Sequence, residues 1–145
     1  MTSEPASVPP SWSPVGATCN TQYFLVGDDI LIVYPNPGSV DDGASARENV
    51  AFQMGLAQKL GRPLGFVVVV SSLTSQDAEA RRVYAAGMLP ERSLGAALVV
   101  QNPLSRAIAS FFLGLTKPKI PTKIVSSIEE GIASFEEVAR PERWS

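Results

Sequence analysis

Two short runs of β-forming residues begin the patterned part of the chain. Residues 22–26 and 30–34 are rich in aromatic and β-branched side chains, and Gly27-Asp28-Asp29 separates them. Glycine adopts the positive φ that a tight turn needs, and aspartate favours turns because its side chain bonds to nearby backbone. The pattern therefore predicts an antiparallel hairpin with a solvated turn.

Three later apolar runs predict strands of a different kind, at residues 66–70, 94–100 and 122–125. The first, FVVVV, has no polar alternation, which is typical of a strand covered on both faces of a parallel sheet. Hydrophobic residues three or four positions apart predict helices in the intervals and after the last strand. These helices are expected over residues 39–60, 75–88, 103–115 and 127–140.

Polar residues stand where each predicted helix starts. Ser39 and Thr74 are the predicted N-caps of the first two helices, and Asn102 is that of the third. Ser127 and Glu130 form the clearest capping box, in which each side chain satisfies a free amide of the other residue.

The order of elements is strand, strand, helix, strand, helix, strand, helix, strand, helix. A helix between two parallel strands is the repeating unit of such folds. We predict an α/β fold over residues 19–140: a single mixed, mostly parallel sheet with an N-terminal antiparallel hairpin and four helices. Residues 1–18, rich in proline and serine, are predicted to be a disordered or loosely docked tail, which Trp12 is able to anchor. Residues 141–145 are predicted to be a C-terminal tail.

The predicted helix at 103–115 is apolar on nearly all sides. At 100° per residue, its large hydrophobic residues share one side, which is predicted to face the core. They are Leu104, Ile108, Phe111, Phe112 and Leu115. Ala109 and Leu113 fall on the opposite side, and an outward leucine beside small residues indicates a candidate interface.

Composition narrows the function classes. The 145 residues carry a net charge of −2 with a pI near 5.1, which argues against nucleic-acid binding. There is no histidine and one cysteine, Cys19, so histidine metal sites and Ser-His or Cys-His nucleophile pairs are excluded. We expect no catalytic residues, no metal and no cofactor. Without a long apolar run or a signal sequence, we expect no transmembrane segment and a cytoplasmic location.

Asn102, Ser105 and Arg106 form a candidate anion- or partner-binding site. They surround a helix N-terminus that follows a strand, where free N–H groups and the helix dipole both favour negative charge. The serine is expected to add a hydroxyl and the arginine a charged fork. The alternative is that Ser105 only helps to cap the helix and Arg106 is an ordinary surface residue.

The segment NPLSRAIASFFLGLTKPKIPTKIVSSIEEGIASF, residues 102–135, carries a family resemblance. Its Pro-x-Ser-Arg start, its apolar helix with Phe111 and Phe112, its Lys117-Pro118 bend and its acidic capping box resemble the small bacterial STAS-like proteins. These are similar to the anti-sigma-factor antagonist of the sporulation switch. The layout agrees over residues 22–138, and the resemblance is specific from residue 102 onward. It implies a STAS-like fold and a regulatory role.

Phosphorylatable STAS antagonists carry an Asp-Ser pair between the third strand and the second helix. This chain has Ser71, Ser72, Thr74 and Ser75 in that place, without the Asp-Ser-Gly order. The resemblance therefore implies a candidate phosphorylation-like loop, because a phosphate at a helix N-terminus is favourable. The alternative is that Thr74 and Ser75 are only helix caps.

We expect a non-enzymatic STAS-like regulatory or scaffolding module that binds another protein, and the resemblance implies a kinase-like protein or a sigma-factor regulator as the partner. A homodimer is a further alternative. The alternative function is a small apolar-ligand or lipid-binding domain, since the STAS fold is similar to that of CRAL-TRIO domains. A crevice beside the helix at 103–115 is the expected ligand site.

Overall fold

The structure is a computed structural model that describes residues 8–144, with the side chains of residues 8–136. The main sheet contains β1 (Trp12–Ala17), β2 (Thr21–Val26), β3 (Ile30–Pro35), β5 (Leu64–Val69), β7 (Ser93–Val99) and β8 (Thr122–Val125). The short strands β4 (Ser39–Asp41) and β6 (Leu73–Gln76) pair separately. The helices are α1 (Gly43–Leu60), α2 (Ala78–Gly87), α3 (Pro103–Leu115) and α4 (Ile128–Trp144), with 3-10 turns at Val70–Ser72 and Pro90–Arg92.

The main sheet is mixed, in the order β1-β2-β3-β5-β7-β8. The first three strands are antiparallel neighbours, and β3, β5, β7 and β8 run parallel. Gly27 makes the predicted hairpin turn between β2 and β3 with a φ of 62°. The predicted α/β fold, with one mixed sheet, N-terminal antiparallel strands and four helices, is confirmed for the described residues.

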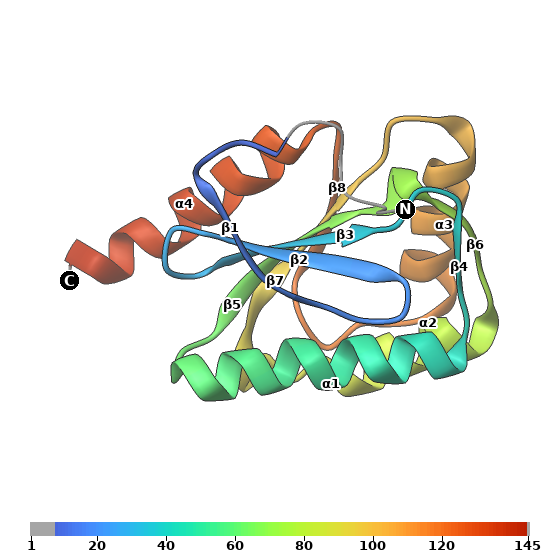
Figure 1. The fold of residues 1–145 in the computed structure, drawn as a ribbon, viewed down its shortest axis with the longest axis horizontal. Helices are drawn as coiled ribbons and strands as arrows, with labels where there is room; N and C mark the ends of the chain where they lie inside the picture. The colour runs from blue at the N-terminus through green and yellow to red at the C-terminus, as the bar shows by residue number, and fades with distance from the viewer. Residues whose placement is uncertain (1–7, 145) are drawn as a thin grey trace.

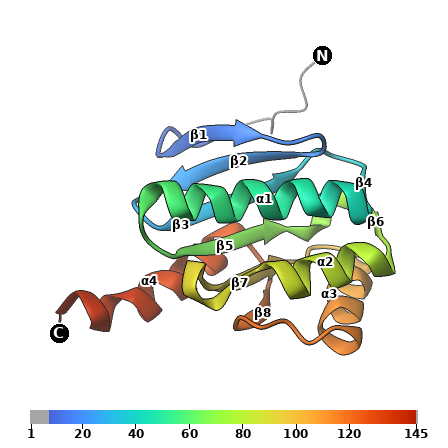
Figure 2. The same ribbon diagram turned by 90° about the horizontal axis from the view of Figure 1, so that it is seen from below.

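The helices cover both faces of the sheet. Figure 1 shows α1 and α2 below the sheet and α4 above it, and Figure 2 shows α1 and α2 side by side across one face. Met54 and Ala57 of α1 pack against Phe66 of β5, whereas Phe135 of α4 packs against Val67 on the opposite face. The third helix, α3, packs beyond them against the carboxyl ends of the strands. The core therefore consists of two layers and an extra cluster at that end.

The N-terminal segment corrects the prediction of a tail over residues 1–18. Residues 1–7 lie outside the described residues, but Trp12–Ala17 form the edge strand β1. The ring centroids of Trp12 and Phe24 are 5.6 Å apart. The strand has no apolar alternation because most of its residues are exposed, and an edge position tolerates Pro14. Gly16 has a φ of +150°, and a Cβ there would lie 2.7 Å from the Phe52 ring.

Two helices begin later than predicted. Asp42, not Ser39, caps α1, and Asp77, not Thr74, caps α2. In both places the residues before the cap are taken up by β4 and β6, which pair with each other in parallel. This pairing joins segments more than thirty residues apart, so local propensity favours the wrong cap at each site.

The prediction of which residues of α3 face the core is correct only for Ile108, which is buried, and Phe112, which packs against the core. Leu104, Phe111 and Leu115 are 49%, 57% and 67% exposed. The buried residues are Ser105, Ile108 and Ala109, so Ala109 is not on an interface, and Leu113 is half-buried. The small residues serine and alanine let the helix approach closely, and the capping bonds of Ser105 keep that residue inside.

The last helix also extends further than predicted. The backbone of α4 is helical through Trp144, so residues 141–144 are not a tail. At its start, Ser127 Oγ accepts from the Glu130 amide at 3.1 Å, which is one half of the predicted capping box. Glu130 Oε1 accepts from the Ser126 amide at 2.9 Å, one residue before the position that the prediction required.

Candidate functional site

The largest group of buried polar side chains surrounds Asp41, at the end of β4. Asp41 is 4% exposed. Its Oδ1 accepts from the hydroxyls of Ser45 at 2.8 Å and Tyr84 at 3.1 Å, and its Oδ2 accepts from the amide Nε2 of Gln76 at 3.3 Å. Burial raises the pKa of the Asp41 carboxyl, and these hydrogen bonds offset the rise only in part. No lysine or arginine in the described part of the chain forms an ion pair with this carboxylate.

Asn49 extends this cluster along α1. The residue is 2% exposed, and its Oδ1 accepts from the hydroxyls of Thr18 at 2.5 Å and Tyr23 at 2.7 Å. Its Nδ2 donates to Asn20 Oδ1 at 3.0 Å and to the Tyr84 hydroxyl at 3.1 Å. Burial raises the pKa of both tyrosine hydroxyls, which therefore stay protonated. We call Asp41, Asn49 and the side chains bonded to them the polar cluster.

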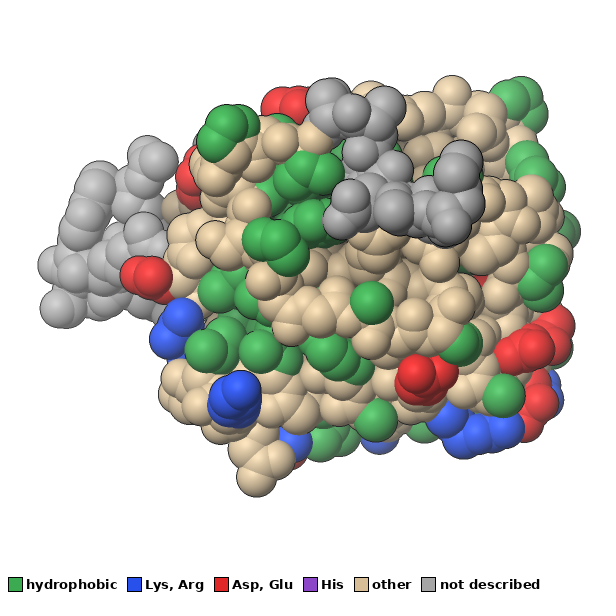
Figure 3. Space-filling view, viewed as in Figure 1, with side chains coloured by type: hydrophobic (Ala, Val, Ile, Leu, Met, Phe, Trp, Pro, Cys, Tyr) green, Lys and Arg blue, Asp and Glu red, His purple; other side chains and the backbone are tan. Residues whose placement is uncertain are grey.

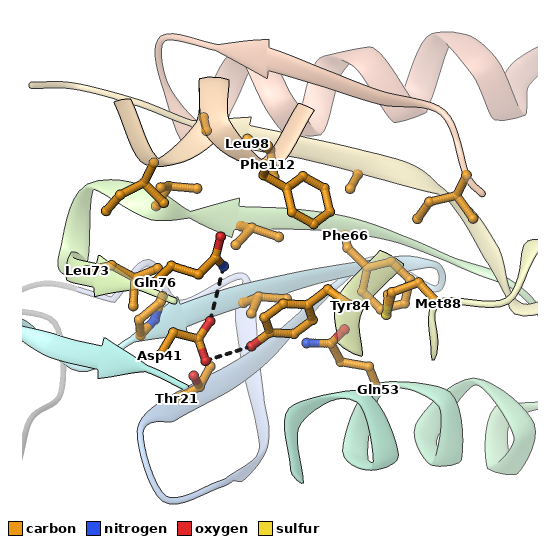
Figure 4. A pocket seen from close by; sticks show the side chains of 18 residues that line it. Thr21, Asp41, Gln53, Phe66, Leu73, Gln76, Tyr84, Met88, Leu98 and Phe112 are labelled. Atoms are coloured by element: carbon orange, nitrogen blue, oxygen red, sulfur yellow. Dashed lines mark hydrogen bonds between the residues drawn. The ribbon is translucent and has the colours of Figure 1, made fainter. Parts of the chain in front are cut away.

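A cavity of about 80 Å³ lies beside the polar cluster, under α3. Its wall is mostly apolar and comes from the sheet, α2 and α3, including Phe66, Met88, Leu98 and Phe112. Figure 4 shows these side chains around the space, with Gln76, Asp41 and Tyr84 at one end. The arrangement is a small, mostly apolar chamber with one polar end.

One acceptor at this polar end has no partner. Gln76 Nε2 faces Asp41, so the amide orientation is fixed, because the reverse would set an oxygen against the carboxylate. Gln76 Oε1 is then buried and accepts no hydrogen bond. A buried unpaired acceptor costs free energy, so this atom is suited to a donor on a ligand.

The three residues of the predicted anion site have different roles in the structure. Asn102 caps α3 through its Oδ1, which accepts from the Ser105 amide at 2.7 Å. Ser105 is fully buried, and its hydroxyl donates to the Asn102 carbonyl and accepts from the amides of Gln101 and Asn102. The serine is therefore a capping residue with no free hydroxyl. Arg106 is exposed beside a shallow depression that also includes Ser126.

The predicted serine loop is not at a helix N-terminus. Ser71 and Ser72 lie in a 3-10 turn, and Thr74 and Ser75 are exposed on β6. The Thr74 hydroxyl donates to the carbonyls of Gly38 and Ser39, at 3.2 Å and 3.1 Å. The helix α2 starts only after Asp77, so neither predicted cap is correct.

The two candidate sites nevertheless lie side by side. One surface depression is lined by Ser71, Ser72 and Thr74 from the first and by Asn102 from the second, with Leu104 at its edge. It occurs where β5 and the start of α3 meet, at the carboxyl end of the parallel strands. Sequence spacing alone did not show this adjacency.

Sequence reasoning missed the polar cluster. Neither Asp41 nor Asn49 was among the predicted site residues. The available signal was the i, i+4 pair Asn49 and Gln53, which falls on the same helix face as the buried residues Ala46, Met54 and Ala57. Amides within an apolar stripe indicate a buried hydrogen-bonded group.

The described residues contain no group of three or more histidine, cysteine, aspartate or glutamate side chains that is able to hold a metal ion. Within the same residues, no helix combines the length and hydrophobicity that crossing a bilayer requires.

Fold and cavity together define a small α/β domain with a mostly apolar chamber that has one polar end. The sequence matches the model of a protein family described as a domain of unknown function (DUF7793) over residues 23–138. This match covers most of the chain, so the protein belongs to that family. The matched region begins in β2 and ends in α4, and it contains both the cavity and α3. A comparison with curated proteins finds no match.

Proposed function

We propose that this chain is a non-enzymatic, STAS-like regulatory or scaffolding domain that binds another protein through the outward face of α3. We define this face by Leu104, Phe111 and Leu115. One observation carries the proposal: among the described residues, four large hydrophobic side chains are strongly exposed, and three of them are these. Clustered exposed hydrophobic residues are typical of interaction sites, whereas isolated ones are ordinary.

Hydrophobic side chains are visible along the edge of the molecule where α3, β4 and β6 lie, on the right in Figure 3. Val40 of β4, 56% exposed, is the fourth strongly exposed residue. An aromatic residue flanked by leucines is a typical centre for a protein interface, because burial of phenylalanine contributes strongly to binding.

The charge around this face indicates the chemistry of the partner. Residues 93–128 contain no aspartate or glutamate, although the whole chain has a net charge of −2. Arg106, Lys117, Lys119 and Lys123 all lie in this segment and are exposed. A complementary partner surface has an apolar centre and an acidic rim, and its binding weakens as salt is added.

The resemblance of residues 102–135 to STAS-like proteins supports a regulatory partner, either a kinase-like protein or a sigma-factor regulator. We place this interaction in the cytoplasm. No enzymatic step is part of the proposal, because the Ser45 hydroxyl that donates to Asp41 is buried and takes part in the capping box of α1.

The test is binding to extract from the source cell with three baits: the unchanged chain, Phe111→Asp and Ala51→Asp. Ala51 is exposed on α1, away from α3, so it controls for the added charge. We expect the same acidic protein to bind the unchanged chain and Ala51→Asp, and to be lost with Phe111→Asp and at high salt. Equal recovery on all three baits would contradict the proposal.

Two further experiments test whether a second copy of the chain or a membrane surface binds this face instead. Sedimentation of the purified chain that shows a dimer, abolished by Phe111→Asp, would assign the face to a second copy. Binding to anionic vesicles that needs Phe111 would assign it to a membrane surface. Either result would replace the proposed partner.

A second candidate, small-ligand binding, is favoured by the cavity. The expected relation to CRAL-TRIO domains suggested an apolar or lipid ligand. A cavity of about 80 Å³ is about half as large as an apolar cavity that holds benzene, so it is too small for a long acyl chain. This candidate therefore narrows to a ligand of a few non-hydrogen atoms.

A further inference from the structure

The polar end of the cavity under α3 determines which kind of ligand the cavity is able to bind. Gln76 Oε1 is buried and accepts no hydrogen bond, and the Asp41 carboxyl lies beside it, accepting from Gln76 Nε2 at 3.3 Å. A ligand that fits this end of the cavity must therefore supply a hydrogen-bond donor to Gln76 Oε1.

Charge narrows the ligand further. The Asp41 carboxylate receives hydrogen bonds from Ser45, Tyr84 and Gln76, all of which are neutral. Within the described residues no cationic side chain is paired with it. A buried carboxylate is much better compensated by a cation than by neutral donors alone. A protonated amine supplies both the charge and three N–H donors.

The rest of the chamber requires an apolar body. Away from the polar end the wall consists of carbon side chains such as Phe66, Val68, Leu98, Ile108 and Phe112. The transfer of a short alkyl chain from water to such an apolar surface is favourable. The volume of about 80 Å³ limits the chain to a few carbon atoms.

We propose that this cavity binds a short primary alkylamine, with its ammonium group at Gln76 Oε1 and Asp41 Oδ2 and its alkyl chain against the apolar wall. This site is separate from the outward face of α3 and does not depend on a protein partner. The ammonium gives the unpaired acceptor a donor, and its charge compensates the buried carboxylate.

The test is an NMR titration of the full chain with three probes of nearly equal size: n-propylammonium, 1-propanol and propionate, with sodium chloride as the salt control. We expect saturable shifts of the Gln76 side-chain amide and of the backbone amide of Asp41 with n-propylammonium. Binding of 1-propanol should be about tenfold weaker or more, since charge-assisted hydrogen bonds are the stronger ones. Propionate should produce no shift at these groups.

Variants assign the recognition to the two acceptors. Asp41→Asn keeps the side-chain shape and should weaken n-propylammonium binding about tenfold or more. Asp42→Asn is the matched control, because it removes the same charge one residue away at an exposed position and keeps an N-cap. If Asp41→Asn does not fold, Gln76→Met removes the other acceptor and should have the same effect.

Three results would overturn the proposal. Equal responses to the amine and the alcohol would show a cavity without charge preference. An unchanged affinity in a folded Asp41→Asn or Gln76→Met variant would place the amine elsewhere. The absence of saturable shifts with every probe would show that the chamber holds water only.

Discussion

Soluble proteins usually bury hydrophobic side chains and expose polar ones. The outward face of α3 and the polar end of the cavity beneath it both depart from this rule, in opposite ways. The outward face exposes Leu104, Phe111 and Leu115 to solvent. The polar end buries Asp41 and Asn49, at 4% and 2% exposure. Each of these regions requires its own explanation.

The comparison separates stability from binding. The buried polar side chains are tolerated because nearly every donor and acceptor is bonded, so their removal should cost folding free energy. The exposed hydrophobic side chains contribute little to folding and become buried only when a partner binds. Substitutions in the two regions should therefore divide between unfolding and binding measurements.

The largest effect is expected on the inner side of α3. Ile108 is 8% exposed, and Ile108→Ala should lower the free energy of unfolding by about 3 kcal/mol, through lost burial and a new cavity. Urea unfolding measures this, with the exposed Ser110→Ala as the control on the same helix. A loss below about 1 kcal/mol would place Ile108 outside the core.

A smaller but clear loss is expected in the polar cluster. Asn49→Ala removes the partner of Thr18 and Tyr23, and should cost about 2 kcal/mol because these hydroxyls lose a buried acceptor. Gln58→Ala, exposed on the same helix, controls for the gain in helix propensity. If the two variants unfold at the same urea concentration, the cluster does not contribute to stability.

The third prediction concerns pH. Because burial raises the pKa of Asp41 above its ordinary value of 3.8, the folded state favours the protonated carboxyl. The contribution of this group to stability is therefore complete below 3.8 and is lost as the pH rises through the raised pKa. The stability difference between the unchanged chain and Asp41→Asn should fall from acid to neutral pH. A difference that rises with pH would mean that the pKa of Asp41 is lowered.

Much of the fold was predictable because it depends on local patterns. The apolar run at 66–70 and the turn at Gly27 indicated a buried strand and a hairpin, and both are present. The strand β1 was not predictable from pattern, since an edge strand with most residues exposed needs no alternation. The pair β4 and β6 depends on contacts between distant segments, which local propensity does not report.

The candidate site was predictable only in part. Asn102 was correctly assigned as a cap from its position before Pro103. The polar cluster was not found, because Asp41 has the same local sequence signal whether it is solvated or buried. The helical periodicity correctly placed Ile108 in the core, but it also placed Phe111 there, whereas the structure exposes Phe111 and buries the smaller Ser105 and Ala109. The orientation of α3 depends on how closely the helix approaches the strand ends, and the periodicity of the sequence does not predict that distance.

The most direct test of the account is the stability of Phe111→Ala. The structure exposes 57% of this residue, so its truncation should change the free energy of urea unfolding by no more than about 0.5 kcal/mol. The periodicity of the sequence alone predicted a core residue, for which the loss is about 3 kcal/mol or more. A change within the smaller limit supports an outward face that is free to bind a partner. A loss of the larger size would show that Phe111 belongs to the core and would remove the proposed binding surface.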